Sequence, residues 1–321
     1  MSAQPTSSQR AAEITRQYGI AVVFVALFVL LVVTLPQFRT VPNLTNVLQQ
    51  NAVIGIIACA MTFAIISGGF DLSVGAGAAL ASVVGAKLMI EAGIPAGILG
   101  ALIAGLLLGL LNGWLIAYAG VNPFVATLGT ATIVRGLIYV STNATPFFGV
   151  PMSFTVVGLG RTGPLPNATW IFLVVALILG FVLHQTRFGH YVYAIGGNIV
   201  AAAEMGIPVR RVKLLVYALV GVCAAIGGII LTGQTASGQP QAALNYELAA
   251  ITAVIVGGAS LGGGRGTIGG TILGVFLLGL VSNALNLYGV SAFWQPVATG
   301  IILVLAVAID GISRRSVFSL Q

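Results

Sequence analysis

The chain has few residues able to do chemistry, and the most informative is Asp71, within Gly68-Gly69-Phe70-Asp71-Leu72-Ser73. Two glycines interrupt an apolar run, and the acid follows at once. A charged side chain at the centre of a bilayer helix costs about 2.5–3.5 kcal/mol on insertion scales, so Asp71 must face water, protein or a helix end. We expect Asp71 and Ser73 to open a helix. The break is either a capped helix end or a flexible gate beside a path.

A second glycine-rich segment, Gly257-Gly258 to Gly264, aligns with the run from Gly68 to Gly75. Both segments follow a span running in the same direction, so the alignment predicts a parallel internal repeat. Residues 264–269 formally match a dinucleotide-binding fingerprint, but no strand–helix crossover surrounds them. A reentrant turn or close helix packing explains the glycines better.

Residues 187–213 form the longest polar interruption, and their centre has helix signals. Asn198 is placed to cap a short helix that runs through Glu204, with Gly206 ending it and Pro208 preventing its continuation. Flanked by basic residues, such a helix either lies on anionic headgroups or inserts into a cleft on a partner protein. The small side chains of residues 201–203 favour protein contact.

The sequence offers no catalytic or cofactor-binding cluster. It has no P-loop ending in Gly-Lys-Ser/Thr, so we expect no ATP hydrolysis by this chain. His184 and His190 bracket a helix end and fit interface or capping roles. Cys59 and Cys223 lie in apolar runs and are expected to be small buried thiols. We predict a protein that is not an enzyme and that binds neither metal nor cofactor.

The composition identifies the elements that position these residues. The chain is 321 residues long, 58% hydrophobic and 6% charged, with a mean hydropathy of +1.07. Average soluble chains are about 25% charged, so this one is predicted to be an all-α polytopic membrane protein. The net charge of +7 fits basic residues collected in cytoplasmic loops rather than a nucleic-acid partner.

Charged residues punctuate the chain at intervals suited to membrane crossing, at about 20 apolar residues per span. Ten spans are predicted, near 20–36, 46–67, 72–90, 96–119, 124–142, 169–185, 213–233, 246–258, 267–287 and 292–310. The eighth is short for a full crossing, so it is tilted, broken or supported by neighbouring protein. Small residues form an i+4 ridge on the fourth span and predict a helix-packing face: Ala101, Gly105, Gly109, Gly113 and Ala117.

The basic residues predict the orientation. With the N-terminus inside, three basic residues face outward (Arg39, Lys87 and Arg161), and nine face inward: Arg10, Arg16, Arg187, Arg210, Arg211, Lys213, Arg265, Arg314 and Arg315. Arg135 falls within a span and either snorkels or faces a hydrated interior. We therefore expect a cytoplasmic tail at 1–19, a transmembrane domain at 20–310 with an uncleaved first helix, and a cytoplasmic tail at 311–321.

Three stretches together resemble the ribose-type permease family of bacterial ABC importers. They are the run at 68–75, residues 194–198 leading to Gly206-Ile207, and Gln239-Pro240 through Tyr246-Glu247-Leu248 to the glycines at 257–264. The similarity covers about residues 45–310 in the same order. Phe70 stands where the family more often has Ile, which is a conservative change.

The resemblance implies an inner-membrane permease that moves a monosaccharide or polyol inward. It implies a homodimer with a central path, a periplasmic sugar-binding protein, and a cytoplasmic ATPase subunit that binds ATP-Mg. Residues 194–207 would form the coupling helix that docks into that ATPase, through Ala194, Gly196, Gly197, Asn198, Ala202, Glu204, Gly206 and Ile207. Pentoses, hexoses, polyols and inositol all remain open as substrates.

The polar residues within the predicted spans fit two roles. They offer transient hydrogen bonds to solute along a path, or they join helices to one another. These residues are Asn51, Asn112, Thr127, Asn283 and Asn286. The competing function is an ion-coupled secondary transporter or a passive channel, but such a protein normally has more intramembrane acids than Asp71 alone.

Overall fold

The computed structural model describes residues 7–318, and side chains within 19–308. The described chain is helical, with four two-residue strands. Its helices are α1 Ser7–Thr34, α2 Val41–Ile66, α3 Val74–Ala92, α4 Ile94–Ala117, α5 Pro123–Thr142, η1 Met152–Phe154, α6 Thr155–Leu159, α7 Asn167–Gln185, α8 Arg187–Gly197, α9 Ile199–Glu204, α10 Val209–Thr235, α11 Tyr246–Val256, α12 Ile268–Leu287 and α13 Trp294–Phe318. The strands pair as β1 Phe147–Phe148 with β4 Ser237–Gly238, and β2 Arg161–Thr162 with β3 Leu165–Pro166.

Each predicted span overlaps one of the described helices, so the prediction of an all-helical membrane chain is confirmed. Seven helices are long and apolar enough to cross a membrane: α2, α3, α4, α5, α7, α10 and α12. Shorter apolar stretches occupy Gly19–Thr34 of α1, the whole of α11 and Trp294–Ala308 of α13. Part of the predicted N-terminal tail is helical, because α1 begins at Ser7.

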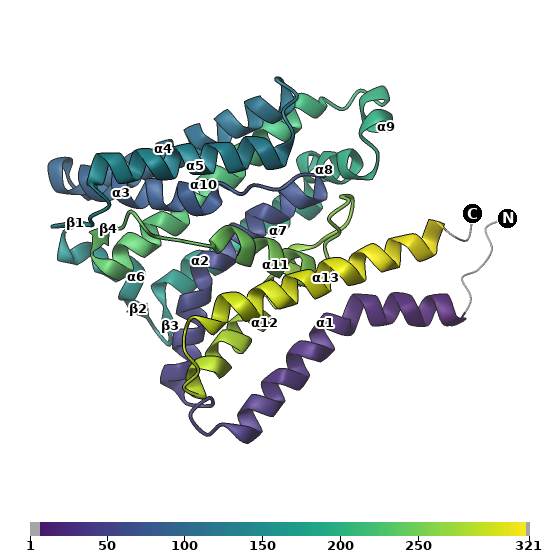
Figure 1. Cartoon of the computed structure of the whole chain (residues 1–321), viewed down its shortest axis with the longest axis horizontal. Coiled ribbons are helices and arrows are strands. Elements are labelled where there is room, and N and C mark those ends of the chain that lie inside the picture. The colour runs from purple at the N-terminus through teal and green to yellow at the C-terminus, as the bar shows by residue number, and fades with distance from the viewer. Residues whose placement is uncertain (1–6, 319–321) are drawn as a thin grey trace.

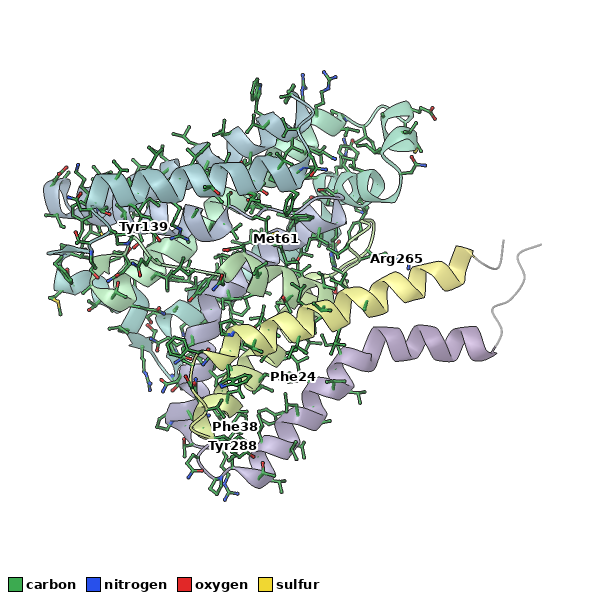
Figure 2. The ribbon with its side chains drawn as sticks, in the orientation of Figure 1. Phe24, Phe38, Met61, Tyr139, Arg265 and Tyr288 are labelled. Atoms are coloured by element: carbon green, nitrogen blue, oxygen red, sulfur yellow. The ribbon has the colours of Figure 1, made fainter. Side chains whose placement is uncertain are left out.

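Helix α2 is the centre of the bundle (Figure 1). Nearly every residue from Ala52 to Ser67 is buried, and Met61 lies near the middle of the molecule in Figure 2. Helices α7, α10, α11 and α12 contribute the other buried apolar side chains of the main core. Large apolar side chains point outward from α4, α5 and α7, as expected for surfaces that contact lipid.

Five of the described helices begin where a side chain satisfies one or two of their first free N–H groups. The Oγ1 of Thr40 accepts from Asn43 N ahead of α2, and Asn122 Oδ1 accepts from Phe124 N ahead of α5. Thr186 and Thr267 cap α8 and α12 in the same way. Proline in the first turn of α2, α4 and α5 reinforces these starts, since it has no N–H to leave unbonded.

The small-residue ridge on α4 is a packing face, as the sequence predicts. Its glycines pack against α10. A Cβ at Gly109 would collide with the backbone at Tyr217 and Ala218, and one at Gly105 with Gly221 O. Gly221 in turn sits directly on Gly105. Glycines therefore let the backbones of α4 and α10 touch, which is the close packing that small residues provide in membrane helices.

Candidate coupling and gating site

The predicted coupling segment folds as two helices rather than one. Ala194, Gly196 and Gly197 end α8, and Ala202 and Glu204 lie in α9. Between them, Asn198 Oδ1 accepts from Val200 N at 3.0 Å and Ala201 N at 3.1 Å. This is the cap that the sequence predicts.

After α9 the chain turns sharply. Gly206 has φ +79°, a conformation that L side chains rarely adopt, and Ile207 N donates to Ala202 O at 3.1 Å. One side of α9 is anchored, because Ala202 is buried. The other side exposes apolar groups, with Val200 63% and Met205 82% exposed. An exposed apolar tip on a short capped helix suits insertion into a partner protein.

The end of α8 touches both glycine-rich segments at once. A Cβ at Gly196 would collide with Ile66 O at the end of α2 and would lie 2.5 Å from Gly264 N. Gly264 N donates to Ile66 O at 2.8 Å, and Tyr193 Oη donates to Gly266 O at 2.7 Å. We call this contact of Ile66, Gly196 and Gly264 the glycine junction. It joins α8 to the end of α2 and to the α11–α12 loop without intervening side chains.

The two glycine turns share one hydrogen-bond pattern. Ser67, Gly68 and Gly69 donate backward to residues four, three and five positions earlier, at the end of α2. Gly257, Gly258 and Ala259 do the same at the end of α11. Gly68 has φ +82° and Gly258 has φ +93°. The sequence alignment pairs Gly68 with Gly257 and is one residue out of register, because the geometry pairs Gly68 with Gly258.

Asp71 lies in a buried hydrogen-bond chain at the start of α3. Its Oδ1 accepts from Ser73 N at 2.7 Å and Ser73 Oγ at 2.6 Å. Ser73 Oγ accepts from Asn112 Nδ2 at 2.7 Å, and Asn112 Oδ1 accepts from Thr130 Oγ1 at 2.7 Å. The chain thus links the α2–α3 turn to α4 and α5. Burial raises the pKa of Asp71, against the lowering effect of the hydrogen bonds from Ser73 and Asn112.

The other predicted path residues bond within the protein. Asn283 exchanges two hydrogen bonds with Asn43, at 2.8 and 3.1 Å, and Asn286 accepts from Gln295. Asn51 donates to Val47 O, and Thr127 donates to Pro123 O. These contacts favour the reading in which polar groups join helices. A path role for them stays a prediction.

Arg135 is held against protein rather than snorkelling to the membrane surface. Its Nη1 donates to the carbonyls of Pro240 and Ala242, each at 3.0 Å. Those carbonyls belong to the irregular segment 236–245 between α10 and α11, which the sequence analysis names for its family resemblance but not as a partner of Arg135. The signal for it was present, since the eighth predicted span is too short to cross.

Within the part of the chain that the structure describes, no group of three or more His, Cys, Asp or Glu could hold a metal ion. Cys59 and Cys223 are buried free thiols. The arrangement can transmit movement from α9 to the glycine turns, and it holds no constellation for bond-breaking chemistry among these residues.

Comparisons with known proteins agree with this picture. Residues 43–307 match the family described as branched-chain amino acid transport system, permease component. The ribose import permease protein RbsC of Bacillus subtilis is 45% identical over 89% of this chain and 91% of its own. RbsC of Escherichia coli K12 is 41% identical over 86% and 87%, and the L-arabinose transport system permease AraH of the same strain is 39% identical over 98% and 96%. No solved structure matches significantly.

The chain belongs to this family of ABC importer permeases. It is a multi-pass membrane protein of bacteria and the transport component of its importer, without ATPase activity of its own. The family implies an ATPase partner and a binding-protein partner. Membership sets aside the ion-coupled transporter and the passive channel.

Proposed function

We propose that this chain imports a neutral monosaccharide or related polyol, delivered by a periplasmic binding protein. The observation that carries the proposal is identity of 39–45%, over nearly the whole chain, to permeases named for ribose and L-arabinose. The scarcity of charge inside the spans supports it, because a neutral solute needs no buried counter-charge. Pentoses are the first candidates.

The proposed membrane arrangement has ten crossings and both termini in the cytoplasm. Its support is the way the connecting segments gather. The segments predicted to be cytoplasmic meet at the glycine junction, and α8 and α9 lie at the same side of the molecule as the start of α1 and the end of α13 (Figure 1). Segments predicted to be periplasmic also meet: β1 pairs with β4, and Arg161 donates to Thr45.

In the proposed mechanism, two copies of the chain enclose the path, and each α9 docks into one ATPase subunit. ATP-Mg binding closes the ATPase pair and moves the docked helices. Because Gly196 rests on Ile66 and Gly264, movement of α8 is passed to the end of α2 and to the loop between α11 and α12. A packed contact of this kind transmits displacement since it cannot compress.

The two glycine turns also support an internal repeat with parallel halves. The α2–turn–α3 unit and the α11–turn–α12 unit have the same hydrogen-bond pattern and the same positive φ. Gly196 of α8 meets Ile66, just before the first turn, and Gly264, in the loop after the second, so α8 contacts both units at one place.

The proposed function is tested by purifying the chain with its co-encoded ATPase and binding protein. The complex, reconstituted in liposomes with internal ATP, should accumulate labelled D-ribose, L-arabinose or a polyol. Leucine is the control solute, because the family description names branched-chain amino acids. ATP-driven uptake of leucine, with none of any sugar or polyol, would refute the proposed substrate class.

A further inference from the structure

A pocket with both apolar and polar lining residues opens on the surface formed by α5, the start of α3 and the segment that leads into α11. Its volume is about 430 Å³, within the range of small-molecule sites. Its polar lining includes Thr132, Arg135, Tyr139, Asn245 and Glu247. We call it the α5–α11 pocket. Tyr139 marks its position in Figure 2, well away from Arg265 of the glycine-rich loop.

The pocket lies at the depth of the membrane centre. Helix α11 has 11 residues and is about 16 Å long, half of a hydrocarbon core of about 30 Å. Its C-terminal end leads into the glycine-rich loop that carries Gly264, at the cytoplasmic side of the proposed arrangement, which places Glu247 midway. Arg135 lies twelve residues beyond Pro123, about 18 Å from the same side. Two charged side chains therefore meet at mid-depth on a surface.

Such a surface cannot face lipid. Ionisable side chains within a membrane face a protein interior or a water-filled cavity. The backbone leads to the same conclusion, because irregular segments at membrane depth occur only inside protein or beside a water-filled cavity. Beside the pocket, Ala243 and Asn245 both have positive φ. This strained backbone is held by Arg135, and strain of this kind concentrates at functional sites.

The pocket presents both acceptors and donors. Asn245 precedes α11, is exposed and lines the pocket, and its side chain caps no N–H of the helix. The Glu247 carboxylate rests against Gly75 of α3, where a Cβ would collide with Oε2. A carboxylate, an amide, a phenol and a threonine hydroxyl together match a solute that carries several hydroxyl groups, each a donor and an acceptor.

The charges favour a neutral solute over a zwitterionic one. Arg135 and Glu247 sum to zero, and Nη1 of Arg135 is already bonded to two carbonyls. The two N–H groups of Nη1 are therefore used within the protein, and only Nε and Nη2 remain to contact a solute.

We propose that the α5–α11 pocket is a binding subsite for a polyhydroxylated neutral solute in the transport path, with Glu247 and Asn245 contacting its hydroxyl groups. This rests on the proposed function and deepens it. The subsite faces the path, and a second copy of the chain closes it from the lipid. Contact is weak and brief, since a site that holds solute tightly slows its release.

The first test uses thiol labelling of the reconstituted complex, because both native cysteines are buried. Thr132→Cys places a thiol in the pocket, and Leu177→Cys places one on the apolar outer face of α7, where Leu177 is 73% exposed. A charged, water-soluble thiol reagent should modify Thr132→Cys and leave Leu177→Cys unmodified. D-ribose or L-arabinose should slow the reaction several-fold, whereas leucine should not. Equal labelling at both positions, or protection by leucine alone, would overturn the proposal.

The second test measures selectivity. Glu247→Gln should change the ratio of ATP-driven D-ribose to L-arabinose uptake at least threefold. Glu91→Gln is the matched control, since it makes the same change at an exposed site at the end of α3. Asn245→Ala is the second variant, in case Glu247→Gln fails to fold. An unchanged ratio in both variants overturns the subsite alone. No sugar uptake by the unmodified complex overturns the proposed function as well.

Discussion

The glycine junction can be tested sharply, because α8 ends in two glycines of which one is packed against backbone and the other faces open space. A Cβ at Gly196 would collide with Ile66 O and lie 2.5 Å from Gly264 N and 2.8 Å from Ile66 C. All of these are backbone atoms, which cannot rotate away. A Cβ at Gly197 would have nothing within 4 Å. Gly196→Ala should therefore disrupt the junction, and Gly197→Ala is its matched control.

The magnitude follows from the comparison of the two variants. Each gains similar helix propensity when alanine replaces glycine, about 0.5–1 kcal/mol, so that term cancels in their difference. What remains is the overpacking cost at Gly196, about 1–3 kcal/mol. If it falls on the equilibrium between inward-facing and outward-facing states, coupling changes about 5- to 150-fold. Gly197→Ala should stay within about twofold of the unmodified protein, as surface changes usually do.

The assay is solute transported per ATP hydrolysed, in liposomes that contain the complete complex. Thermal unfolding of the purified complex gives the accompanying stability change. Gly196→Ala should hydrolyse ATP with little transport and unfold at lower temperature, while Gly197→Ala behaves as the unmodified protein. Equal coupling in the two variants would refute the idea that direct backbone contact at Gly196 carries the movement of α8.

Four further variants test the coupling segment and Asp71. Asn198→Ala removes the cap of α9 and should cost about 1 kcal/mol and weaken ATPase docking in a pull-down, whereas Asn198→Asp should retain docking. Gly206→Pro should abolish uptake but not membrane insertion, because proline is fixed near φ −65° and Gly206 needs +79°. Glu204→Arg should also uncouple uptake from ATP hydrolysis, because it reverses a charge on the exposed face of α9. Normal uptake in either variant would contradict the coupling role. Asn112 Nδ2 donates to Asp71 Oδ2 at 3.5 Å, so Asp71→Asn would place an amide N–H opposite this donor. The maximal uptake rate should therefore fall while KM stays unchanged. An altered KM at normal rate would indicate solute contact instead.

Much of the fold is predictable from local signals. The spacing of charged residues places the spans, since a charge in lipid is costly and an apolar run of about 20 residues is not. The cap at Asn198 and the stop at Gly206 are equally local, and both are found in the structure. The ridge at Gly105, Gly109 and Gly113 predicts a packing face because its i+4 spacing places the residues on one side of a helix.

The sequence does not predict which helix that ridge meets, nor that a separate helix precedes the one capped by Asn198. The resemblance implies one coupling helix over residues 194–207, whereas the cap at Asn198 begins α9 and residues 194–197 end α8. The glycine junction depends on residues 66, 196 and 264 meeting in space, and no spacing along the chain indicates that. The register of the two turns also escaped alignment, because pairs of neighbouring glycines match equally well when shifted by one.

The predicted path residues show why polarity alone is a weak guide to a transport path. Buried polar groups in a membrane protein must be satisfied, so most of them bond to neighbouring helices and have nothing left for a solute. Asn283 bonds to Asn43, and Asn112 is held between Ser73 and Thr130. Polar side chains that line an open pocket at mid-depth in the proposed membrane arrangement are a better guide. Glu247 and Asn245 meet that criterion, because α11 is too short to cross and its first residues are therefore left inside the membrane.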